Sequence, residues 1–175
     1  YRMDDALDVT ALGTLADVMR LTGQNRILVR GGLEKIACAR RPGMLALKTV
    51  SGLDPLARLT GGQVVFRLAP RINAAGRMGK ADIALKLLRS KDCAKAAELA
   101  QQLDALNTER KQEEERIWAE AREQALRLME SRPRPALVIY GADWHPGIIG
   151  IVASRLLDEF YRPTVILCDD GGSLK

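Results

Sequence analysis

The chain has 175 residues, of which 47% are hydrophobic and 28% charged, and it carries a net charge of +5 with a sequence pI of about 9.3. This apolar fraction excludes a disordered chain, and no apolar run reaches the ~18 residues that a membrane span needs. The basic balance favours an anionic partner, most commonly nucleic acid, although only 4% of residues are aromatic, too few for a surface that grips bases mainly by stacking.

The three cysteines, Cys38, Cys93 and Cys168, lie far apart and form no CxxC pair. An odd and scattered set predicts neither a disulfide framework nor a zinc site, and it is typical of a reducing cytosol. We therefore expect a cytoplasmic protein in which the thiols act as small apolar side chains.

The first 90 residues are predicted to be mostly helical. Apolar positions recur at helical spacing between residues 4 and 18. Asn25 can cap a second helix that ends near Ala37. The stretch "GGQVVFRL" (61–68) fits either a helix or a strand. Further helical segments are expected at 43–50, 54–59 and 81–90.

Residues 91–131 contain no Gly or Pro and consist largely of strong helix formers, which predicts one helix about 60 Å long. Its middle, "NTERKQEEER", is polar on every side, and i,i+4 pairs such as Arg110/Glu114 and Lys111/Glu115 can support it. Its two ends carry apolar stripes, made by Ala96, Leu99, Leu103, Ile117, Ala121 and Leu128. This pattern favours a bridge between two domains, with a coiled-coil arm as the alternative.

After "RPRP" the pattern changes to strand, helix and strand at 136–141, 147–160 and 164–169, which is a βαβ unit. The predicted fold class is therefore α/β: a mostly helical N-terminal part, a long bridging helix, and the βαβ start of a second α/β domain. Because two strands and one helix cannot close a good core, we expect this second domain to be cut short.

The stretch "RLAPRINAAGR" (67–77) is predicted to be a loop that carries three arginines and no acid. Guanidinium groups match phosphate oxygens, often with two hydrogen bonds, and Gly76 would let a sugar-phosphate backbone approach closely. The alternative is that Arg67, Arg71 and Arg77 pair with acids on neighbouring elements.

Asp17 stands in the apolar stretch "ALGTLADVM", where an unpaired charge is costly. A divalent cation could compensate it, but spacing alone favours a helix cap or an ion pair with an arginine.

The stretch "DWHPGIIG" (143–150) follows a strand and opens a helix, a common ligand position in α/β sheets. Gly147 and the helix N-terminus could present N–H groups to an anion, and His145 is the only histidine. A turn without function explains the stretch equally well. One aspartate and one distant histidine do not make a complete hydrolytic metal site.

Together these stretches resemble the RecJ family of single-stranded-DNA-specific exonucleases in the DHH phosphoesterase superfamily. The motifs "ALGTLADVM", "PRINAAGR", "DWHPGIIGIVASRL" and "GGSLK" are similar to motifs of that family and occur in the same order. The resemblance implies that 1–90 is the C-terminal part of a DHH domain, 91–132 the linking helix, and 133–175 the N-terminal part of a DHHA1-type domain, truncated here.

The resemblance also implies a metal-dependent 5′-to-3′ exonuclease that acts on single-stranded DNA in repair and recombination, with manganese or magnesium as cofactor. It makes Asp17 a catalytic metal ligand. Its implied DNA-binding residues are Arg71, Asn73, Arg77, His145, Gly147, Ser173 and Lys175. Because the Asp-His-His triplet and the earlier aspartate motifs are missing, the chain alone is expected to be inactive. The alternatives are a non-catalytic DNA-binding or scaffold relative and a phosphoesterase for short oligonucleotides.

Overall fold

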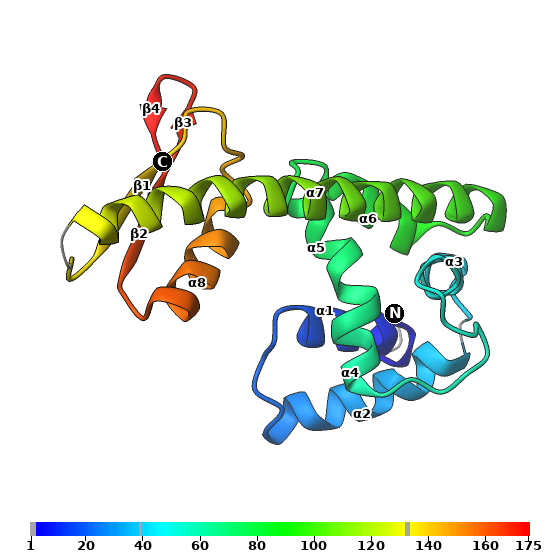
Figure 1. Ribbon diagram of the computed structural model, residues 1–175. Helices are drawn as coiled ribbons and strands as arrows, with labels where there is room; N and C mark the ends of the chain where they lie inside the picture. Colours follow the sequence, from blue (N-terminus) through cyan, green and yellow to red (C-terminus); the bar gives the residue numbers. More distant parts are fainter. Residues whose placement is uncertain (1–2, 39, 132–133) are drawn as a thin grey trace. The chain divides into compact units, whose positions relative to one another are not determined.

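The computed structural model describes residues 3–38, 40–131 and 134–175 (Figure 1). The chain divides into two compact units, Tyr1–Asn107 and Thr108–Lys175. Helix α7 (Cys93–Ser131) contributes residues to both. A helical first part, one long helix and a parallel βαβ arrangement confirm the predicted α/β fold class.

The first unit is built from helices around one apolar core. Helix α1 packs against α2, and the continuous helical run of α4, η2 and α5 packs against α1 (Figure 1). The elements are η1 (Met3–Ala6), α1 (Leu7–Ala16), α2 (Gly23–Cys38), α3 (Pro42–Val50), α4 (Gly61–Gln63), η2 (Val64–Leu68), α5 (Ala69–Arg77), α6 (Ala81–Arg89) and the start of α7. The most deeply buried core side chains include Leu12, Ile36, Met44, Leu47, Leu68, Leu87 and Leu103.

The contact between α1 and α2 depends on a glycine. A Cβ atom at Gly32 would lie 2.3 Å from the Leu7 carbonyl oxygen and 2.3 Å from the Ala11 Cβ. Only glycine lets the two helix backbones approach this closely. The approach fixes the position of α1, whose C-terminal end carries Asp17.

The predicted arginine loop is wrong, because residues 67–77 lie in η2 and α5. A capping box between Thr60 and Gln63 starts the helical run. Pro70 is the second residue of α5, directly after the π-helical turn η2, and because it has no N–H it donates no hydrogen bond to the preceding turn. The helix ends at a turn in which Gly79 has φ +70° and the Lys80 N–H donates to the Ala75 carbonyl at 2.7 Å.

The helix expected at 54–59 is also absent, and irregular chain stands in its place. The Asp54 carboxylate accepts a hydrogen bond from the Leu56 N–H at 2.9 Å, a local turn that competes with helix formation. The buried Lys48 ammonium donates to the carbonyls of Pro55 and, at 3.1 Å, Ala57. The other helices expected in this unit are present, but the predicted cap at Asn25 is wrong, because α2 begins at Gly23 and the Asn25 amide donates to the Arg20 carbonyl at 3.1 Å.

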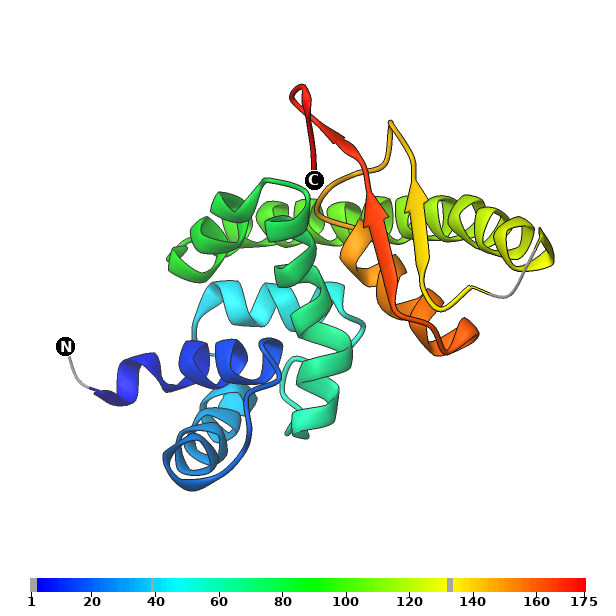
Figure 2. The same ribbon diagram turned by 90° about the vertical axis from the view of Figure 1, so that its left-hand side faces the viewer.

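The second unit contains the predicted βαβ arrangement. Strand β1 (Leu137–Tyr140) pairs in parallel with β2 (Thr164–Leu167), and α8 (Ile149–Phe160) connects them. Figure 2 shows the two strands side by side with α8 against them. A short hairpin of β3 (Asp169–Asp170) and β4 (Ser173–Leu174) follows. The buried side chains of this unit include Ile117, Ala121, Ala125, Leu137, Ile139, Trp144, Ile148, Val152 and Leu156.

The long helix predicted for 91–131 is confirmed by the 39 residues of α7. The predicted apolar positions at both ends are buried, except Leu128, which is half-buried. Its middle is not solvated on every side, because Asn107 is buried and Glu114 pairs with both Arg110 and Arg155. The predicted domain boundary at 132–133 lies outside the described residues. No described helix is long and apolar enough to cross a membrane.

Candidate nucleic-acid interface

An open depression of about 550 Å³ lies in the first unit, between the end of α1 and one face of α5. Three predicted site residues, Asp17, Asn73 and Arg77, line it. The Asn73 amide donates to the Ala16 carbonyl at 3.2 Å, which fixes α5 against the end of α1. A carboxylate, an amide and a guanidinium group therefore share one surface, although 56 residues separate Asp17 from Asn73 in the chain.

Asp17 is exposed, so the expectation of an acid inside an apolar environment is wrong. It caps the C-terminal end of α1, and its N–H donates to the Gly13 carbonyl at 3.0 Å. The next residue, Val18, has φ +52° and is 78% exposed, so the chain turns outward here. Within the described ranges the Asp17 carboxylate makes no ion pair, and it faces open space at the depression.

An exposed carboxylate suits a hard divalent cation. Among the residues that the structure describes, however, no group of three or more His, Cys, Asp or Glu side chains could hold a metal ion. The described residues therefore do not form a complete magnesium or manganese site. Asp17 could supply one ligand, and the others would have to come from elsewhere.

The three arginines of the motif do not gather at one place. Arg71 pairs with Asp104 on α7 at 2.7 Å and also donates to the Arg67 and Val50 carbonyls. Arg67 donates to the Ser51 carbonyl at 2.7 Å. The sequence left open, as the alternative to phosphate binding, that these arginines pair with acids on neighbouring elements. Arg71 makes such a pair. Only Arg77 of the three lines the depression, and the DNA-binding role of Arg71 stays a prediction.

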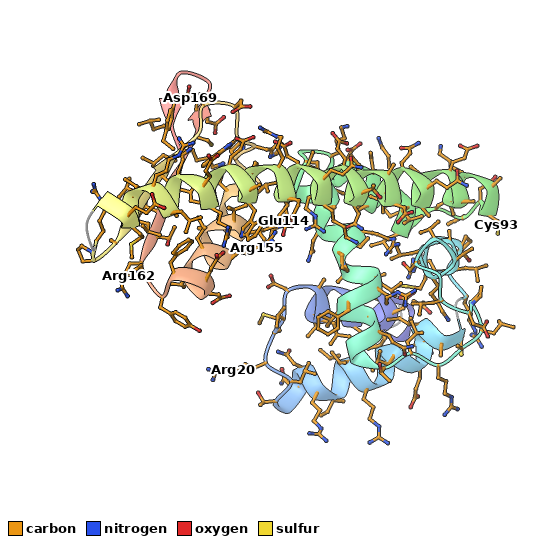
Figure 3. All side chains as sticks on the ribbon, viewed as in Figure 1. Arg20, Cys93, Glu114, Arg155, Arg162 and Asp169 are labelled. Carbon is orange, nitrogen blue, oxygen red and sulfur yellow. The ribbon has the colours of Figure 1, made fainter. Side chains whose placement is uncertain are left out.

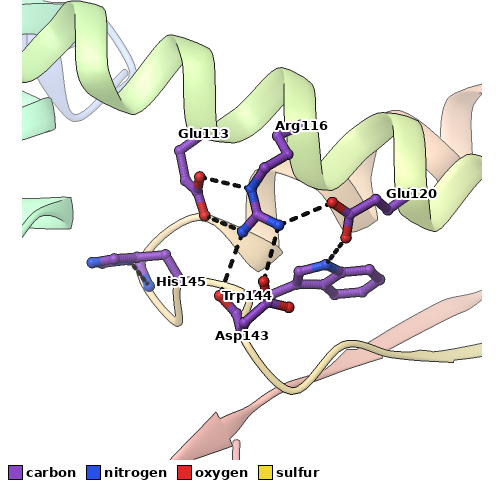
Figure 4. A network of polar contacts seen from close by, with 7 residues as sticks. Glu113, Arg116, Glu120, Asp143, Trp144 and His145 are labelled. Carbon is purple, nitrogen blue, oxygen red and sulfur yellow. Dashed lines mark hydrogen bonds and ion pairs between the residues drawn. The ribbon is translucent and has the colours of Figure 1, made fainter.

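In the second unit, His145 and Gly147 interact with each other. The Gly147 N–H donates to His145 Nδ1 at 3.0 Å. The Gly147 N–H is thus used inside the turn, whereas the sequence suggested that it faces an anion. Figure 4 shows His145 extending away from the neighbouring Trp144.

A polar network, which sequence reasoning missed, attaches this turn to α7 (Figure 4). The buried Trp144 donates through Nε1 to Glu120 at 2.8 Å. Arg116 pairs with Glu113 at 2.6 Å, with Glu120 at 2.9 Å and with Asp143 at 3.1 Å. The hydrogen bond to Glu113 is the main reason that the pKa of Arg116 is raised above its ordinary value. For α7, the pairs expected from the sequence are within the helix, such as Arg110/Glu114.

A second contact of α7 involves Arg155 on α8. Its guanidinium lies 4.3 Å from the ring centroid of Trp118, at cation–π distance, and 3.0 Å from the Glu115 carboxylate. Figure 3 shows Arg155 beside Glu114. The polar middle of α7 is therefore the surface on which α8 is oriented.

Ser173 and Lys175 lie at the end of the chain, at and just after β4. The backbone of Lys175 exchanges hydrogen bonds of 3.1 and 3.0 Å with that of Cys168. Both side chains are exposed, and the Lys175 ammonium lies 3.9 Å from the Asp170 carboxylate. These residues and His145 occupy separate segments of the second unit, and their DNA-binding roles stay predictions.

No family model matches the chain. It is 40% identical over 166 residues to the single-stranded-DNA-specific exonuclease RecJ of Bacillus subtilis, covering 94% of this chain and 20% of the relative. It is 41% identical over 176 aligned residues to the single-stranded-DNA-specific exonuclease RecJ of Salmonella typhimurium. That alignment covers 98% of this chain and 30% of the relative.

Solved structures agree with these relatives. The chain is similar to the crystal structure of RecJ from Thermus thermophilus in complex with Mg²⁺, with a TM-score of 0.82 and 37% sequence identity. The match covers 95% of this chain and 26% of the Thermus thermophilus chain. A crystal structure of exonuclease RecJ bound to manganese is similar with a TM-score of 0.80 and 36% sequence identity. That match covers 95% of this chain and 41% of the solved chain.

The relatives in sequence and in structure are of one class, the single-stranded-DNA-specific exonucleases. Within that class the chain belongs to the RecJ family. It spans about a fifth to a third of the length of the curated relatives it matches. The RecJ structures to which it is similar hold magnesium or manganese.

Proposed function

We propose that this chain is part of a metal-dependent 5′-to-3′ exonuclease that degrades single-stranded DNA in the cytoplasm during repair and recombination. The observation that carries the proposal is the shared depression of Asp17, Asn73 and Arg77, in a chain similar to RecJ over nearly its whole length. Residues 1–90 then correspond to the end of a DHH domain, 91–132 to the linking helix, and 133–175 to the start of a DHHA1-type domain.

Each residue of the depression has a distinct proposed role. Asp17 would supply one carboxylate ligand to a divalent metal ion, which would provide the activation of the attacking water. Arg77 attracts a phosphate, and Asn73 holds α5 against the end of α1 through the Ala16 carbonyl while it lines the same surface. None of these groups needs to touch a base edge, so binding is tolerant of sequence.

Arg71 has a positioning role in this proposal, and contact of its guanidinium with the DNA strand stays a prediction. Its bonds to Asp104 and to two carbonyls keep α5 packed, and α5 presents Asn73 and Arg77. In the second unit, His145, Gly147, Ser173 and Lys175 are the proposed further contacts to the strand.

The test is the binding of labelled single-stranded DNA to the chain at several salt concentrations. Arg77→Gln removes one phosphate contact, so the negative slope of log K against log salt should become shallower by about 0.7 for every base composition alike. Lys111→Gln is the matched control, because it removes one exposed positive charge from α7. An unchanged slope for Arg77→Gln, or a loss limited to one base composition, would remove Arg77 from the DNA path.

A further inference from the structure

A second depression, of about 300 Å³, lies in the first unit near the start of α1 and is rich in positive charge. Among the residues that the structure describes, five cationic side chains and two carboxylates line it, which give those residues a net charge of +3. The charged lining residues are Asp5, Asp8, Lys35, Arg40, Arg41, Arg89 and Lys91. No predicted site residue belongs to it.

One of its cations is structural. Arg41 pairs with Asp8 at 2.9 Å and donates to the carbonyls of Asp5 at 2.8 Å and Leu88 at 3.2 Å. The hydrogen bond to Asp8 raises the pKa of Arg41. Because Arg41 neutralises Asp8 and is held on several sides, it forms a fixed wall of the depression.

Three other cations are available to a ligand. Arg40, Arg89 and Lys91 are charged side chains at the surface, and over residues 3–38, 40–131 and 134–175 none of them makes an ion pair. Arg89 and Lys91 also line the adjoining depression, together with Lys95 at the start of α7. The described lining of that depression also includes Asp92 and the ion pair of Lys86 with Asp82, so its positive charges outnumber its carboxylates but are partly neutralised.

This basic depression is separate from the one that contains Asp17. Asp8 is the second residue of α1, and Asp17 caps its opposite end. Nine residues of α-helix at 1.5 Å each place the two ends about 13 Å apart. One ligand phosphate cannot occupy both, but successive phosphates of one strand could.

We propose that the depression lined by Arg40, Arg89 and Lys91 binds a backbone phosphate of a nucleic-acid strand, as a second contact beyond the Asp17 depression. Its positive net charge favours an anionic ligand. The planar guanidinium groups of its arginines can donate two parallel hydrogen bonds to phosphate oxygens. No aromatic side chain is among its described lining residues, so it contacts the backbone and not the bases. The inference rests on the proposed function for the identity of the strand, though not for the affinity for phosphate.

The experiment compares the chain with an Arg89→Gln/Lys91→Gln double variant and with the Lys111→Gln control. Because both changes are at the surface, the double variant should melt without ligand at the parent's temperature. Its negative slope of log K against log salt for single-stranded DNA should be shallower by about 1.4, as expected for two lost phosphate contacts at about 0.7 each. An unchanged slope would overturn the proposal.

A second measurement separates this inference from the proposed function. Inorganic pyrophosphate should raise the melting temperature of the parent and of Lys111→Gln but not of the double variant. If the parent fails to bind DNA, the proposed function fails, while this difference still supports a phosphate site. If the double variant loses the pyrophosphate effect but keeps the full DNA slope, the site takes free phosphates and the strand contact is refuted.

Discussion

At the scale of single residues, Gly141 makes room for Trp144. A Cβ atom at Gly141 would lie 2.2 Å from the indole ring, and that ring is buried and hydrogen-bonded to Glu120. The absence of a side chain thus lets the turn after β1 close over the tryptophan.

Gly141→Ala should therefore destabilise the second unit by about 1–3 kcal/mol, because the ring or the backbone must move. Gly150→Ala is the matched control, since a Cβ there meets nothing within 4 Å and lies in α8. That change should stabilise by about 0.5–1 kcal/mol. Both tryptophans belong to the second unit, so urea unfolding followed by tryptophan fluorescence reports on it.

Equal stabilities for the two glycine variants would contradict the close contact between Gly141 and the indole ring. The same would follow if Gly141→Ala left the fluorescence of the folded chain and its unfolding midpoint unchanged.

Asp17 places a negative charge at the C-terminal end of α1, where the helix dipole is also negative. Asp17→Asn should therefore raise the stability of the chain by about 0.3–1 kcal/mol in the presence of a chelator. In a complete enzyme of this family the same change should lower the single-turnover rate at saturating manganese by orders of magnitude. The measurements are a melting curve and that rate.

A large fall in melting temperature for Asp17→Asn would make the carboxylate a structural group. Near-normal cleavage would remove it from the proposed metal site.

The motifs identified residues that share a surface, but they did not predict the hydrogen-bond and ion-pair partners of those residues. Asp17, Asn73 and Arg77 do share one surface. The partner of Arg71, however, is Asp104, 33 residues away, and only the packing of α5 on α7 brings the two together. No spacing rule along the chain can identify such a partner.

At the scale of elements, composition predicted α7 and the βαβ unit because their patterns are long and regular. Composition did not predict the structure of segments whose conformation depends on a few side-chain hydrogen bonds. Residues 54–59 are held in irregular conformation by Asp54 and by Lys48 from α3. Residues 67–77 form a helix because the capping box starts the run at Thr60 and Gly79 ends it.

Lys48 tests this account of the irregular segment. Its ammonium donates to three carbonyls, those of Ile36, Pro55 and Ala57. Lys48→Met leaves these acceptors without a donor and should destabilise the chain by about 1–3 kcal/mol at pH 7.

The effect of pH on Lys48 has a definite sign. Burial lowers the pKa of Lys48 below its ordinary value of 10.5. Between the lowered pKa and 10.5 the unfolded chain binds more protons than the folded one, so the stability of the parent relative to Lys48→Met should rise with pH in that window. Urea unfolding of both chains at pH 7 and pH 10 measures the difference, and a difference that shrinks at pH 10 would contradict the burial of this charge.

At the scale of the whole molecule, each unit carries proposed DNA contacts of its own. The first carries Asp17 with Arg77 and, separately, the basic depression. The second carries the anchored turn of Trp144 and His145. The chain covers 20–30% of its RecJ relatives from Bacillus subtilis and Salmonella typhimurium.

We therefore expect the chain alone to bind single-stranded DNA without hydrolysing it. Its phosphate contacts need only positive charge, which the described residues supply at two depressions. Hydrolysis by a metal-activated water needs several ligands around the ion, and among the described residues only Asp17 is proposed as one. Purified chain incubated with 5′-labelled single-stranded DNA and manganese should release no nucleotide, while a gel shift at low salt shows the complex. Nucleotide release that disappears on Asp17→Asn would refute this expectation, because it would mean that the chain assembles a working metal site around that carboxylate.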